Sequence, residues 1–189
     1  MKLKPIGDFL NKNGFIKNGN NDFYKVHDKF VNCINFQKKS TGDIFFINTG
    51  VHPVFENFCN EPPKKEIDCY IRNRVCDGLS ISLLHSFEGS EFVISEIKNK
   101  AFCFFEYFDS LNKIFDAIRV VDIEERNICD ELSGVSSVRL ALMCMNYQYE
   151  KKKFSLVSDF ANYGLAISRG PVPKKALDLP LYFQTPVIT

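Results

Sequence analysis

The stretch Phe30–Pro53, FVNCINFQKKSTGDIFFINTGVHP, indicates the centre of the fold. Two apolar-rich runs flank the polar segment 38–43, and neither run keeps a helical spacing long enough to favour a helix. Short polar segments that contain Gly and Asp are typical of turns. We therefore expect two antiparallel strands joined by a short turn, at the centre of an antiparallel sheet.

The chain before this hairpin adds a helix and a second hairpin. Apolar residues at helical spacing predict a short amphipathic helix over residues 3–13. The pair Asn18-Gly19 is a strong turn signal, because both residues tolerate positive φ angles. We expect it to join strands over residues 14–17 and 22–27.

The chain after the central hairpin carries further strand signals. Residues 69–75 alternate between two faces, which predicts a strand. Residues 79–84 and 91–97 are separated by Glu88-Gly89-Ser90, and we expect them to form one more hairpin. The sheet would then have about six strands, a common size.

The second half of the chain changes to helical spacing. Apolar residues recur every three or four positions over residues 101–118, which predicts one long or one broken helix. A further helix is expected over residues 121–132. Two antiparallel helices are expected over residues 138–145 and 154–165.

These elements predict an α+β fold, with an N-terminal helix and C-terminal helices packed on a mainly antiparallel sheet. We expect an α+β sheet domain over residues 1–119 and a helical extension of the same core over residues 120–169. Residues 170–189 contain four prolines and are expected to form an irregular tail.

Composition excludes several classes of function. A net charge of +1 over 189 residues provides no bulk positive field, so we expect no nucleic-acid partner. The chain starts without an apolar signal core, and no apolar run approaches the length of a membrane span. With seven cysteines, an odd number spread along the chain, the sequence indicates a cytoplasmic protein with reduced thiols and no membrane association.

The clearest polar group lies on the predicted sheet. Asn35 and Gln37 share one face of one strand, and Arg72 and Arg74 share one face of another. If these faces coincide, two guanidinium groups and two amides form a surface suited to a carboxylate, a phosphate or an acidic protein loop. The alternative is a solvated sheet face with cross-strand pairing.

Sequence patterns for catalysis and for cofactor binding are absent. The glycines form neither GxGxxG nor a P-loop, and neither GxSxG nor HExxH occurs. The spacing of Cys69 and Cys76 does not fit a zinc knuckle. A pairing of Cys33 with His52 stays open, although buried inert thiols explain the cysteines better. We expect no catalytic residue, no metal and no cofactor.

Several segments resemble the bacterial domain-of-unknown-function family 4304. They are the short helix ending at Gly14-Phe15 and the segments VNCINFQKKS (31–40), FINTGV (46–51), CYIRNRV (69–75) and FEYFDSL (105–111). The resemblance covers about residues 3–119. It implies an α+β fold and no established activity. As motif positions it singles out Gln37, Asn48, Gly50, Arg72 and Arg74.

Two functions of different classes fit these observations. The first is a non-catalytic protein that binds a protein partner, for example an immunity-type protein that neutralises a toxin by direct binding, with Asn35, Gln37, Asn48, Arg72 and Arg74 as the expected binding residues. The second is an enzyme that acts on a small anionic substrate held by Arg72 and Arg74. An enzyme requires a concave pocket that combines the arginines with a titratable group, whereas a binding protein can present them on an open surface.

Overall fold

The structure is a computed structural model that describes residues 3–55, 61–108 and 110–169. The described residues form two compact units. The first consists of residues 3–54 and 61–108, and the second consists of residue 55 and residues 110–169. The predicted tail at 170–189 lies outside the described residues.

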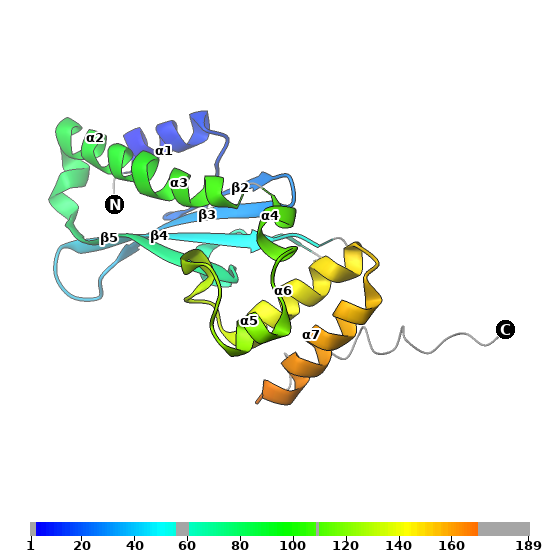
Figure 1. Cartoon of the computed structure of the whole chain (residues 1–189). Coiled ribbons are helices and arrows are strands. Elements are labelled where there is room, and N and C mark those ends of the chain that lie inside the picture. The colour runs from blue at the N-terminus through cyan, green and yellow to red at the C-terminus, as the bar shows by residue number, and fades with distance from the viewer. Residues whose placement is uncertain (1–2, 56–60, 109, 170–189) are drawn as a thin grey trace. The chain divides into compact units, whose positions relative to one another are not determined.

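The first unit is built on an antiparallel sheet in which the strands follow one another in chain order (Figure 1). Its five strands are β1 (Ile16–Asn18), β2 (Asp22–His27), β3 (Phe30–Lys38), β4 (Ile44–Pro53) and β5 (Ile71–Ser80). The expected central hairpin is confirmed, since Phe30 pairs with Pro53 and Lys38 pairs with Phe45. The α+β fold class and the first hairpin are confirmed as well.

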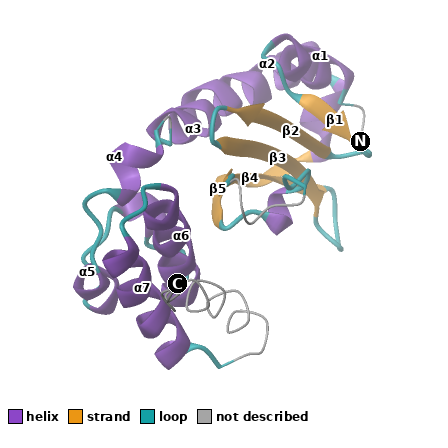
Figure 2. Cartoon of the chain, turned by 90° about the vertical axis from the view of Figure 1, so that its right-hand side faces the viewer, coloured by secondary structure: helices purple, strands orange, loops and turns teal. Residues whose placement is uncertain are grey.

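Helices cover one face of this sheet, which we call the inner face (Figures 1 and 2). They are α1 (Lys4–Lys12), η2 (Ile81–His85), α2 (Phe87–Glu96), the π-helix η3 (Ile97–Phe102) and α3 (Cys103–Tyr107). The sheet contributes Phe23, Phe36 and Phe45 to the core, with ring centroids 6.0 and 6.4 Å apart along the series. The N-terminal helix is therefore confirmed, and it packs over a phenylalanine core.

The expected hairpin of residues 79–84 and 91–97 is wrong, because these segments lie mainly in η2 and α2. The hydroxyl of Ser86 accepts a hydrogen bond from the Gly89 amide at 3.0 Å, so Glu88-Gly89-Ser90 forms the first turn of a helix. Val93, Ile94 and Ile97 are buried at helical spacing. The sheet consequently has five strands, close to the expected six.

The second unit is helical. Its elements are α4 (Leu111–Phe115), α5 (Val120–Glu124), η4 (Asp130–Leu132), α6 (Ser137–Glu150) and α7 (Phe154–Ile167). The helix pair α6 and α7 is confirmed, and the Ser136 side chain caps α6. The helix predicted over 121–132 is wrong in its extent, because Arg126 adopts a φ of 59° and ends the helical path. The broken form of the helix expected over 101–118 is confirmed by α3 and α4.

Candidate functional site

The strand register places all five predicted binding residues on one face of the sheet, opposite to α1, α2 and α3. Asn35 is paired with Asn48, and Asn48 is paired with Arg74. Gln37 lies two residues beyond Asn35 and Arg72 lies two residues before Arg74, so strand alternation keeps them on the same side. We call this side the outer face. The expectation that the amide and arginine faces coincide is therefore met.

A row of hydrogen bonds crosses the outer face from β2 to β5. The Asn35 amide donates to Asp22 Oδ1 at 2.7 Å, and the Asn48 amide donates to Gln37 Oε1 at 2.9 Å. Arg74 Nε donates to Asn48 Oδ1 at 3.2 Å. We call these five residues the polar row: Asp22, Asn35, Gln37, Asn48 and Arg74. Because most of its side chains are held by a neighbour, the row presents an ordered pattern of donors and acceptors.

Arg74 is the exposed cationic end of the polar row. Its Cζ lies 4.4 Å from the centroid of the Phe46 ring, a cation–π arrangement that fixes the plane of the guanidinium. Its Nη1 lies 3.6 Å from the exposed carboxylate of Asp77. The Arg74 side chain remains 48% exposed, so part of its forked donor set faces solvent.

Arg72 has a different environment, because it contacts a buried carboxylate. Its Nε lies 2.5 Å from Oε1 of Glu66, which belongs to η1 (Glu66–Asp68) and is only 4% exposed. The same segment packs closely over β4: a Cβ atom added to Gly50 would lie 2.7 Å from Cys69 Cβ. Arg72 therefore connects η1 to the sheet, in addition to facing the outer surface.

Three residues of this surface were missed by the sequence-based interpretation. Asp22 and Phe46 could have been found from the register between neighbouring strands, since Asp22 is paired with Asn35 and Phe46 is paired with Gln37. Glu66 follows a proline-rich segment without regular spacing, so no local signal in the sequence indicated that it lies beside Arg72.

Cys69 and Cys76, two buried thiols of the first unit, are poor nucleophiles. The adjacent Cys33 thiol and burial raise the pKa of Cys69. Burial and a hydrogen bond to Glu96, at 3.1 Å, raise the pKa of Cys76 to about 12. A thiol with a raised pKa carries little thiolate at neutral pH, so neither cysteine is suited to covalent catalysis. Within the described ranges, no three His, Cys, Asp or Glu residues are grouped so that they could hold a metal ion.

Thiol exposure leads to a direct prediction. We expect a thiol reagent added to the native protein to modify the exposed Cys103 first, whereas the buried Cys33, Cys69, Cys76 and Cys144 should react only after unfolding. Titration in denaturant without reductant should give all seven thiols of the sequence. A count of five would instead reveal a disulfide.

Among the cavities lined by described residues are two that include neither Arg72 nor Arg74. One lies on the inner face of the sheet, next to α3. The other lies in the second unit, beside α5 and α7, and Arg119 and Asp159 are among its lining residues. The side chains of Arg72 and Arg74 are 41% and 48% exposed on the outer face. None of the helices in the described part of the chain is long and apolar enough to cross a membrane.

Comparison with known proteins identifies the family. A family model described as Domain of unknown function (DUF4304) matches residues 6–102, slightly more than half of the chain. The chain therefore belongs to this family, and the matched region contains every residue of the polar row together with Glu66 and Arg72. No curated protein and no solved structure matches the chain.

Proposed function

We propose that this protein is a non-catalytic binding protein whose outer sheet face docks an acidic segment of a protein partner. The observation that carries the proposal is the position of Arg74, which lies over the Phe46 ring, is oriented by Asn48 and remains open to solvent. An oriented guanidinium loses little conformational freedom on binding, and its forked donors match a carboxylate.

The surroundings of Arg74 favour a protein partner over a small substrate. Asn35 and Gln37 on β3 extend the polar surface beyond Arg74 on β5, and Asn48 on β4, which is only 6% exposed, connects the two, so the polar groups are spread over three strands. Interfaces commonly combine an arginine or aromatic anchor with a polar rim. The enzyme alternative requires a pocket that combines the arginines with a titratable group, whereas the observed contacts of Arg74 lie along a partly exposed sheet face.

We propose further that this is a cytoplasmic protein of bacteria, in which toxin neutralisation by direct binding, as in immunity proteins, is one concrete form of the function. Supporting this location, the buried cysteines of the described residues are free thiols, which is typical of reducing compartments.

The experiment is affinity capture from cells that encode the protein, with quantification by mass spectrometry. Wild-type protein and Arg74→Glu are compared as baits, and Lys38→Glu, at the exposed end of β3, serves as a control with the same change in charge. We expect one acidic protein to be retained by wild type and Lys38→Glu and lost with Arg74→Glu. If no captured protein depends on Arg74, the outer face is not the binding surface.

A further inference from the structure

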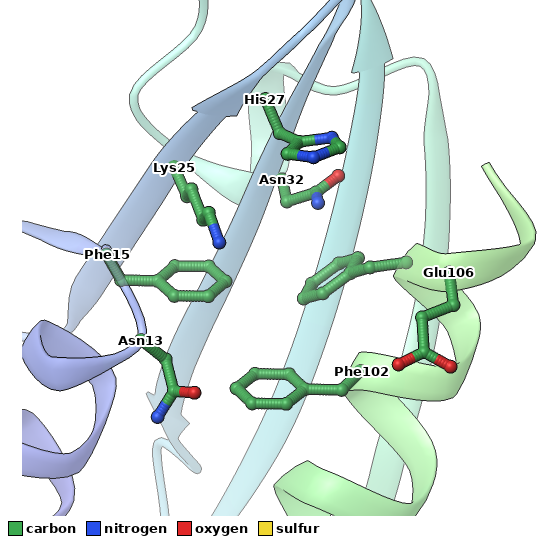
Figure 3. Close-up of a pocket in the computed structure, with 8 residues that line it drawn as sticks. Asn13, Phe15, Lys25, His27, Asn32, Phe102 and Glu106 are labelled. Atoms are coloured by element: carbon green, nitrogen blue, oxygen red, sulfur yellow. The ribbon is translucent and has the colours of Figure 1, made fainter. Parts of the chain in front are cut away.

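The inner face of the sheet carries a cavity of about 220 Å³ that is separate from the polar row. Figure 3 shows it between β2 and β3 on one side and the helical segment of Phe102 and Glu106 on the other. Asn13 and Phe15, which follow α1, lie on its left-hand side in this view. All of its lining residues belong to the first unit.

One wall of the cavity is aromatic. The rings of Phe15 and Phe102 lie parallel, with an interplanar angle of 1° and centroids 6.0 Å apart. The Phe105 ring is tilted by 37° to Phe15, with centroids also 6.0 Å apart. Three rings around one space form a surface on which a planar apolar group can pack.

The opposite wall is polar and comes from the sheet. Lys25 and Asn32 are paired in register on β2 and β3, and His27 follows two residues after Lys25. The chain of Lys25 lies across Gly14, since a Cβ atom added there would be 3.4 Å from Lys25 Cε. Figure 3 shows the Lys25 amine and the Asn32 amide nitrogen directed towards the rings.

These polar groups lack partners within the described part of the chain. Asn32 is 8% exposed, and its buried Oδ1 has no hydrogen-bond partner there. Lys25 and His27 form no ion pair with the described residues. A buried amide oxygen without a partner destabilises a fold, so the presence of Asn32 at the wall of a cavity calls for an explanation other than stability, and its Nδ2 donor is the atom turned towards the rings (Figure 3).

We propose that this cavity binds a small aromatic monocarboxylate. The aromatic ring packs against Phe15, Phe102 and Phe105, while the carboxylate accepts hydrogen bonds from Lys25 Nζ and Asn32 Nδ2, with His27 beside them. Glu106 lies on the helical side, across from these donors, and disfavours a second carboxylate by repulsion. This site does not depend on the proposed function of the outer face.

The test uses four probes and a protein labelled with ¹⁵N, observed by NMR. The probes are benzoate, 2-naphthoate, 2-naphthamide and naphthalene-2,6-dicarboxylate. We expect saturable shifts at the Asn32 side-chain amide and the backbone of β2 with the two monocarboxylates. The neutral amide and the dicarboxylate should bind at least about tenfold more weakly than 2-naphthoate. If neither monocarboxylate gives saturable shifts at millimolar concentration, the proposal is overturned.

Two variants separate binding from stability. Lys25→Gln should weaken 2-naphthoate about tenfold and leave 2-naphthamide unchanged, whereas the matched change Lys38→Gln on the same sheet should affect neither probe. Asn32→Leu should abolish carboxylate binding and raise the melting temperature, because it removes an unpaired buried amide. Binding of 2-naphthoate that is unaffected by both Lys25→Gln and Asn32→Leu would place the probe elsewhere and overturn the assignment.

Discussion

We expect Gly89→Ala to lower the free energy of unfolding by about 3 kcal/mol, the upper end of the range for overpacked sites. A Cβ atom at position 89 would lie 2.1 Å from the carbonyl oxygen of Leu83 and 2.7 Å from Leu83 Cα. These are backbone atoms, so no side-chain rotation relieves the overlap. The η2 segment and the first turn of α2 must therefore move apart. This movement also disturbs the core of the first unit, because α2 contributes the buried Val93 and Ile94.

The matched control is Gly7→Ala in α1. A Cβ atom at this position would meet only the edge of the Phe23 ring, at 3.7 and 3.8 Å, which is ordinary packing distance. Alanine is favoured over glycine inside a helix by up to about 1 kcal/mol, so this variant should be neutral or more stable. Denaturant unfolding of both variants measures the difference. Equal stability of the two variants would contradict the packing of α2 against η2.

The second large effect concerns the pair of Arg72 and Glu66. Removing one partner of a buried ion pair leaves an uncompensated charge, which commonly costs about 3–5 kcal/mol. The Arg72 side chain is 41% exposed, so water can screen the Glu66 carboxylate from that side. We therefore expect Arg72→Gln to lower the free energy of unfolding by about 2 kcal/mol.

Single variants are needed here, because the two arginines have different surroundings. If both arginines served only a ligand, changing both to Gln would alter the free energy of unfolding by only about 0.5 kcal/mol, the range of surface substitutions. Glu66→Gln combined with Arg72→Gln should recover most of the loss, since the pair is then neutral. Arg74→Gln should cost less than about 1 kcal/mol, the scale of an exposed cation–π contact. If chemical denaturation shows that Arg72→Gln and Arg74→Gln lower the free energy of unfolding equally, the contact with Glu66 does not give Arg72 a larger role in stability than Arg74.

Local sequence signals predicted the elements that are determined locally. The central hairpin combines two apolar runs with a polar turn, and α6 and α7 follow long helical spacings, so their positions could be predicted. The short apolar runs within residues 79–97 are compatible with a strand as well as with a helix, so the sequence pattern alone does not separate the two. The decisive interactions are the Ser86 cap and the close approach of Gly89 to Leu83, and the latter depends on tertiary packing.

The candidate sites show the same limit. Strand alternation was sufficient to place Asn35, Gln37, Arg72 and Arg74 on common faces, and the register then brought these faces together. Sequence could not reveal the pairing of Arg72 with Glu66, because an irregular segment provides that carboxylate. The inner cavity combines residues from the first hairpin with others more than sixty positions away, so no motif spacing indicates it.

The most direct test of the central claim, that Arg74 serves binding and contributes little to stability, is a calorimetric titration of the captured partner with wild-type protein and Arg74→Gln. We predict that the variant binds at least about tenfold more weakly, as expected for an arginine at the centre of an interface, while its melting temperature stays close to that of the wild type. Unchanged affinity in the variant, or a loss of affinity that only accompanies unfolding, would contradict the assignment of the outer face as the binding surface.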